Sequence, residues 1–121
     1  MKTTHSRQSE IEKTLDKLLQ DGAFVGAVVA NEQGLPIATS GQADTELIAA
    51  VAASMKQLAE RPHQQLTEIT TMDNQGHKIV SRFFSIGEDL IILAVEIPSN
   101  RTYRRLMASA IKEIKLVWSG S

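Results

Sequence analysis

Six consecutive apolar residues, LIILAV at positions 90–95, constrain the fold of this chain most strongly. The run follows the turn residues Gly87, Glu88 and Asp89, and its length and composition are typical of a strand. A strand that does not alternate between apolar and polar residues has to be buried on both faces. We therefore expect residues 90–95 at the centre of a sheet that is covered on both sides.

Four further strands are predicted at residues 24–30, 35–40, 66–72 and 77–86. The first pair flanks residues 31–34 (NEQG) and the second pair flanks residues 73–76 (DNQG); both turns end in glycine, where a positive φ is often required. Turns this tight make the joined strands antiparallel. Residues 66–72 are half polar and the strand at 35–40 contains Pro36, so both strands are expected at edges of the sheet.

Apolar residues recur at helical spacing in residues 8–20, 44–61 and 101–118. Ser9 could open the first helix in a capping box, Asp44 is the expected N-cap of the second, and Pro62 is expected to end it. The segment from Asn100 to Thr102 is expected to start the third helix. The element order is therefore helix-strand-strand-helix-strand-strand-strand-helix, and the fold class is α/β, an α+β sandwich around one antiparallel sheet.

The chain of 121 residues is long enough for one domain, which we place at residues 9–118 between a flexible tail at 1–8 and a short tail at 119–121. The net charge of -1 gives no overall attraction to nucleic acid or anionic lipid. No secretory signal or span of about 18 apolar residues is present, so we expect a cytoplasmic protein without membrane insertion. The absence of cysteine excludes disulfides and thiolate metal sites.

Catalytic signatures are missing from the sequence. It has no phosphate-binding glycine motif and no GxSxG elbow, and its three histidines are not at metal-ligand spacing. Neighbouring carboxylates such as Glu10 with Glu12 are explained by solubility. We therefore expect a protein that is not an enzyme, with no catalytic residue, no cofactor and no metal ion.

Two surfaces could bind partners. The last helix carries a basic stripe on the side opposite its apolar face, which is either a solvated face or a docking surface for an acidic partner. The stripe consists of Arg101, Arg104, Arg105, Lys112 and Lys115. The middle helix has an outer side with small residues, which allow a second helix to approach, and the neighbouring edge strand could join another copy. The residues of this expected interface are Glu46, Ala49, Ala50, Ala53, Lys56, Gln57, Glu60, Glu68 and Thr70.

Four segments together resemble the roadblock family, the roadblock and dynein light-chain domain that also occurs in bacterial and archaeal regulators of Ras-like GTPases. They are LDKLL at 15–19, GAVVANEQGLPIATS at 26–40, DTELIAA at 44–50 and ILAVEIPSNRTYRRLMASAIK at 92–112. The resemblance implies a five-stranded antiparallel sheet of order 2-1-5-4-3, with the second helix on one face and the terminal helices on the other. It also implies a homodimer joined through the second helix and the third strand.

The same resemblance implies a non-enzymatic scaffold or regulator that binds a small Ras-like GTPase through the exposed side of the second helix. In some bacteria, dimers of this family stimulate GTP hydrolysis without inserting a catalytic residue. Some of those relatives carry extra terminal segments that this sequence lacks, so the resemblance favours GTPase binding over activation. The alternative is a small-molecule sensor, which would need an apolar pocket with convergent polar groups; Gly26 is the only hint of one.

Overall fold

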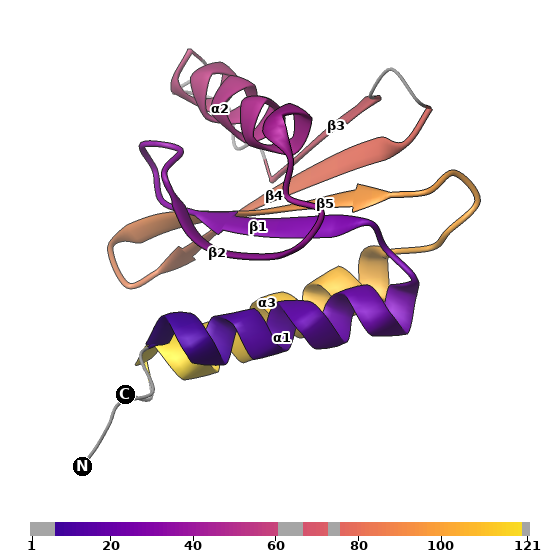
Figure 1. The fold of residues 1–121 in the computed structure, drawn as a ribbon. Helices are drawn as coiled ribbons and strands as arrows, with labels where there is room; N and C mark the ends of the chain where they lie inside the picture. The colour runs from indigo at the N-terminus through magenta and orange to yellow at the C-terminus, as the bar shows by residue number, and fades with distance from the viewer. Residues whose placement is uncertain (1–6, 61–66, 73–75, 120–121) are drawn as a thin grey trace.

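The computed structural model describes residues 7–60, 67–72 and 76–119, with the side chain of Glu46 left out. Three helices and five strands form two helical layers around one sheet (Figure 1). In chain order the elements are α1 (Arg7–Gly22), β1 (Gly26–Ala30), β2 (Pro36–Gly41), α2 (Thr45–Ala59), β3 (Glu68–Met72), β4 (Lys78–Ile86), β5 (Asp89–Ile97) and α3 (Arg104–Ser119).

The five strands form one sheet in the order β2-β1-β5-β4-β3, and every neighbouring pair is antiparallel. Strand β5 is central, and each of its residues from Ile91 to Ile97 is buried, as the apolar run predicted. The half-polar strand β3 and the proline-containing strand β2 are the two edges. The predicted fold class, element order and strand order are thereby confirmed.

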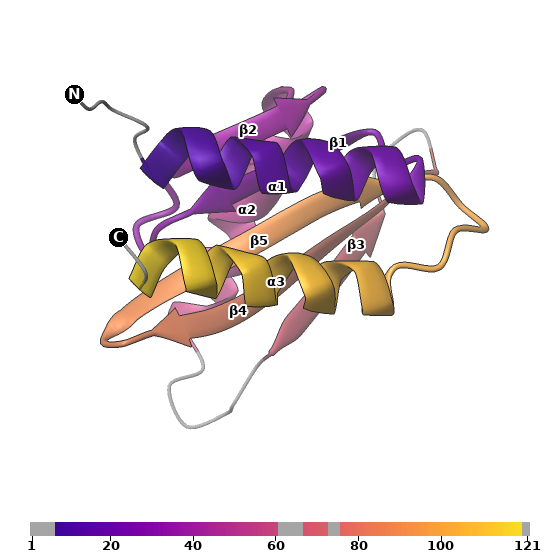
Figure 2. The same cartoon turned by 90° about the horizontal axis from the view of Figure 1, so that it is seen from below.

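Each face of the sheet has its own hydrophobic core. Helix α2 covers one face alone, while α1 and α3 lie side by side across the other (Figures 1 and 2). Alternate residues of β5 divide between the cores, because successive side chains of a strand point to opposite faces. Ile92 packs with Leu47 and Val51 of α2, whereas Leu93 packs with Leu15 of α1 and Met107 of α3.

The turn between β1 and β2 has the chemistry that its sequence predicts. The Asn31 Oδ1 accepts hydrogen bonds from the backbone N–H groups of Gln33 at 2.9 Å and Leu35 at 3.0 Å. Gly34 has a φ of 80°, a left-handed conformation that glycine adopts without a Cβ clash. Of the second turn, Gly76 has a φ of 85°, and residues 73–75 lie outside the described part of the chain.

Helix ends were predicted less well than helix existence. The Asp44 cap is confirmed, since its Oδ1 accepts from the Leu47 N–H at 3.1 Å, whereas Pro62 lies outside the described residues. The Ser9 capping box is wrong, because α1 already begins at Arg7 and places Ser9 inside the helix. The predicted start of α3 at Asn100 is also wrong. Asn100 has a φ of 79°, a left-handed conformation that is incompatible with a right-handed helix, and α3 begins at Arg104.

Candidate functional site

Strand β3 leaves one edge of the sheet open. Among the described residues it pairs with β4 only, and the Phe83 N–H donates to the Thr67 carbonyl oxygen at 3.0 Å. Backbone groups in an antiparallel pair alternate between facing the partner and facing away. The N–H and C=O groups of Glu68, Thr70 and Met72 therefore point outward, and no other described residue hydrogen-bonds to them. This edge can accept another strand.

The side chains of β3 divide between the two faces of the sheet. Ile69 packs against the core under α2. Glu68 instead lies on the α3 side, where its carboxylate accepts from Arg82 Nε at 2.9 Å and from the Tyr103 hydroxyl at 3.1 Å. Thr70 pairs with Val80, whose side chain belongs to the core of α1 and α3. The structure thus does not bring the Glu68 and Thr70 side chains together with α2; only their backbone belongs to the expected interface.

Helix α2 presents small and polar side chains to solvent on the side away from the sheet. The exposed residues predicted from the sequence are Ala49, Ala53, Lys56, Gln57 and Glu60, and Ala50 is half-buried. Glu46 lies in the first turn of α2. The structure therefore brings the exposed members of this set onto one helix surface, whereas Ala50 packs against the core under α2.

Buried contacts orient α2 about its axis. The Ser54 hydroxyl donates to the Ser81 hydroxyl of β4 at 3.3 Å, and both residues are buried. Ala50 and Gln57 lie one helical turn from Ser54, and Ala53 directly precedes it. These three residues therefore form the flank of α2 on the side of β4 and β3. On the other flank, the Ala52 Cα lies 3.8 Å from where a Cβ would stand on Gly34. The flank nearest the open edge is therefore the one that includes Ala53.

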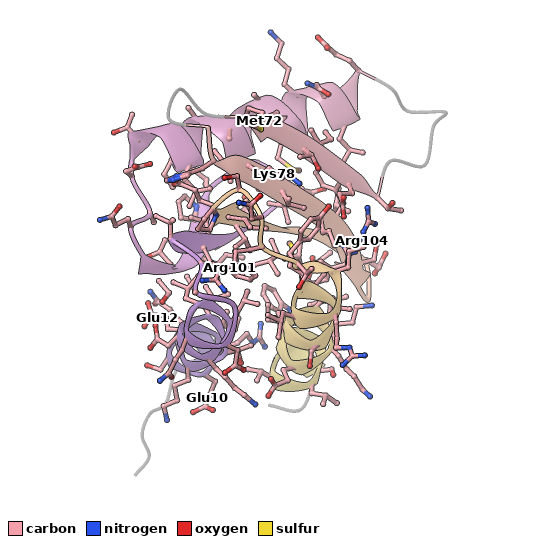
Figure 3. All side chains as sticks on the ribbon, turned by 90° about the vertical axis from the view of Figure 1, so that its right-hand side faces the viewer. Glu10, Glu12, Met72, Lys78, Arg101 and Arg104 are labelled. Atoms are coloured by element: carbon pink, nitrogen blue, oxygen red, sulfur yellow. The ribbon has the colours of Figure 1, made fainter. Side chains whose placement is uncertain are left out.

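The predicted basic stripe is divided by the structure. Arg101, Arg104 and Arg105 line an open groove of about 530 Å³ at the start of α3, together with Lys78, Thr102, Tyr103 and Leu106. Lys112 and Lys115 are exposed farther along α3 and do not line it. Figure 3 shows Lys78, Arg101 and Arg104 at the same end of the molecule. We call this hollow the basic groove.

The sequence does not mark Lys78 and Tyr103 as residues of the basic groove. Lys78 opens β4, and Tyr103 precedes α3, so 25 positions of sequence separate them. The Lys78 Nζ lies 6.0 Å from the centre of the Tyr103 ring, and the Arg104 guanidinium carbon lies 5.5 Å from it. No local sequence signal predicts this contact, because the loop and the sheet bring the two residues together.

The described surface gives no support to a small-molecule site at Gly26 or to a metal site. Its hollows are open ones, and Gly26 does not line a cavity, since a Cβ there would lie 2.4 Å from the Gln42 carbonyl oxygen. Across residues 7–60, 67–72 and 76–119, no three His, Asp or Glu side chains gather as metal ligands would. Within the same ranges, no helix has the length and apolar character needed to cross a membrane.

Solved structures with the same fold include several bacterial proteins. MglB from Myxococcus xanthus superposes with a TM-score of 0.76 at 11% identity, covering 99% of this chain and 96% of that one. The gliding protein MglB from Thermus thermophilus gives 0.77 at 9% identity, with 98% and 96% covered. A Roadblock/LC7 domain from Streptomyces avermitilis gives 0.65 at 14% identity, with 88% and 93% covered.

Sequence comparison supplies the family. No curated protein sequence matches this chain significantly. The family model described as Ragulator complex protein LAMTOR5 matches residues 7–95, which include every strand except the last two residues of β5. This match shows the family, and the sheet order and the placement of the three helices agree with it. The chain therefore belongs to the roadblock family, in the group described as Ragulator complex protein LAMTOR5.

Proposed function

We propose that this chain is a non-enzymatic homodimeric scaffold or regulator that binds a small Ras-like GTPase. The observation that carries the proposal is the position of an open strand edge beside a helix flank of small residues. Strand β3 leaves the backbone groups around Thr70 without a partner among the described residues, and the neighbouring flank of α2 includes Ala50 and Ala53. Membership of the roadblock family supports the same arrangement.

The proposed dimer joins β3 to β3 and α2 to α2 about a two-fold axis. An interface of this kind places the same patch on both copies, so a strand edge and a helix flank on one side of the molecule can both be self-complementary. Pairing the two β3 strands extends the sheet across both copies and removes an edge that would otherwise favour aggregation. Alanine at position 53 allows the two α2 helices to approach closely.

The GTPase would bind the outer surface of the paired α2 helices. Ala49, Lys56 and Glu60 project away from the sheet on this surface, next to the flank that forms the dimer contact. Such a platform regulates a GTPase only if it binds one nucleotide state more tightly than the other, because a ligand shifts an equilibrium by its differential affinity. Stimulation of GTP hydrolysis would then come from holding the GTPase's own residues in place.

The binding test begins with purification of the tagged protein from an extract of its native cell, in the presence of either GDP or a GTP analogue. We expect a Ras-like GTPase to be enriched with one nucleotide, and the purified pair to show at least about a tenfold difference in Kd between the two states. Equal affinities would retain scaffolding and refute regulation. Failure to enrich any Ras-like GTPase over a tag-only control would refute the proposed partner.

The substitution Ala53→Arg tests the helix contact. A long charged side chain on this flank should prevent the close approach of two α2 helices and give monomers in light scattering after size exclusion. Ala108→Arg is the matched control, since Ala108 is an exposed alanine on α3. An unchanged dimer for Ala53→Arg, or equal dissociation of both variants, would contradict the assignment of α2 to the dimer interface.

A further inference from the structure

We infer that the basic groove binds an acidic peptide segment of a partner protein, at a site separate from the proposed GTPase surface. The groove lies between the start of β4 and the start of α3 (Figure 3). Helix α3 covers the face of the sheet opposite to α2 (Figure 1). Nothing about the groove depends on dimer formation or on the GTPase.

The charge of the groove is concentrated and uncompensated. Lys78, Arg101, Arg104 and Arg105 line it, and no acidic residue of the described ranges does. None of the four has a carboxylate partner within the described parts of the chain. A protein with a net charge of -1 has no general excess of cations, so this local excess attracts anionic ligands to one place.

The Glu68 carboxylate, which bonds to the groove residue Tyr103, already has two hydrogen-bond partners. Glu68 accepts from Arg82 Nε at 2.9 Å and from the Tyr103 hydroxyl at 3.1 Å. The second bond holds the Tyr103 ring in place, and the Lys78 and Arg104 side chains lie against that ring at 6.0 Å and 5.5 Å. The Tyr103 side of the groove is thus fixed before a ligand binds, which lowers the conformational entropy lost on binding.

The lining selects carboxylates together with apolar groups. Arginine presents a planar fork of N–H donors that binds a carboxylate through two parallel hydrogen bonds, and three of the four cations are arginines. The Tyr103 ring and Leu106 add apolar surface between these charges. A segment in which acidic and apolar side chains alternate would satisfy both parts of the lining.

A peptide fits this shape better than a membrane does. The cations line a hollow of about 530 Å³, a size typical of small-ligand sites, whereas a bilayer presents a flat surface that cannot enter it. Lys112 and Lys115 lie roughly 12 Å and 17 Å along α3 from Arg104, at a rise of about 1.5 Å per residue. At physiological salt these distances exceed the screening length of about 8 Å, so the two lysines do not extend the groove's field.

Taken with the proposed function, on which this point rests, the position of the basic groove lets one dimer bind a GTPase and an acidic partner together. Because α2 and α3 cover opposite faces, a GTPase on α2 would leave the basic groove free. The dimer would then carry two grooves, and a partner with two acidic segments could bind both with raised effective concentration. The protein would connect a GTPase to an acidic partner.

The test uses fluorescence anisotropy with a fluorescein-labelled peptide of eight alternating Glu and Leu residues. A peptide with Gln in place of Glu is the neutral control. The full chain should bind the Glu peptide and not the Gln peptide, and raising NaCl from 50 to 300 mM should weaken binding. The double variant Arg101→Glu with Arg104→Glu should weaken binding at least about tenfold, because two charge-assisted contacts become repulsive.

The matched control is the double variant Lys112→Glu with Lys115→Glu, which changes the net charge by the same amount but on the part of α3 outside the groove. It should weaken binding less than about threefold at 300 mM NaCl, where its charges are screened. Equal weakening by both variants would refute the groove, and so would no binding by the wild-type chain. Binding to phosphatidylserine vesicles in place of the peptide, lost in the Arg101→Glu, Arg104→Glu variant, would replace the peptide by a lipid and overturn the proposal.

The two proposals can fail separately. All four substituted residues are exposed, so circular dichroism and Tm should match the wild type. The Arg101→Glu, Arg104→Glu variant should keep the oligomeric state and the GTPase affinity of the wild type. Loss of peptide binding alone therefore reports on the groove, whereas loss of GTPase binding in Ala53→Arg reports on α2.

Discussion

The substitution Thr70→Pro separates the proposed dimer interface from the fold of the single chain. The Thr70 N–H points away from β4, so a proline there removes no hydrogen bond within the sheet. In a β3-to-β3 pairing centred on Thr70, the outward groups of Glu68, Thr70 and Met72 would form about six backbone hydrogen bonds across the two copies. Thr70 is the middle residue of the strand, and its N–H takes part in every symmetric register near this centre.

The expected effect follows from the number of lost bonds. Each copy contributes one Thr70 N–H, so the symmetric variant loses two hydrogen bonds and leaves two carbonyl groups unpaired in the interface. At about 1–3 kcal/mol for each buried group left unsatisfied, dimerisation weakens by about 2–6 kcal/mol. This corresponds to an increase in Kd of about 30-fold to 20,000-fold.

The matched control is Thr39→Pro on the opposite edge of the same sheet. The Gln42 N–H donates to the Val25 carbonyl oxygen at 3.0 Å, and counting along the register from that pair leaves the Thr39 N–H facing away from β1. Sedimentation equilibrium over concentrations of about 1 to 100 μM should show dissociation of Thr70→Pro, while Thr39→Pro keeps the wild-type Kd. A change of less than about tenfold for Thr70→Pro, or a larger change for Thr39→Pro, would refute dimerisation through β3.

Further predictions concern the fold that presents these surfaces, each measured by urea unfolding. Gly26→Ala should destabilise the protein by about 1–3 kcal/mol, because the added Cβ would lie 2.4 Å from the Gln42 carbonyl oxygen. An unchanged urea midpoint would contradict this, since it would mean that the backbone at the start of β1 shifts without cost. Asp44→Ala should cost about 1 kcal/mol through loss of the α2 cap, and Asn in its place should restore stability. Ser54→Ala should cost about 1–3 kcal/mol by leaving the buried Ser81 hydroxyl unpaired, and the double variant with Ser81→Ala should cost less than the sum of the two single changes. Additive effects would contradict the Ser54–Ser81 contact.

Local patterns in the sequence determined the elements and their order. The apolar run around Leu93 identified the central strand, since only burial on both faces accounts for it. The Asn31 turn and the Asp44 cap were predictable because each depends on residues two to four positions away. Periodicity located the helices but not their ends, as the start of α3 at Arg104 shows.

Contacts between distant segments were decided only by the tertiary structure. Strand register turned the Glu68 side chain toward α3 and left its backbone at the open edge, and a shift of one residue would have reversed that orientation. The basic groove exists because the sheet brings Lys78 to Tyr103 across 25 positions, a contact that no short-range pattern encodes. The sequence by itself therefore determined which layers this chain builds, whereas the folded chain decided which side chains meet on their surfaces, because faces and edges are set by pairing between strands.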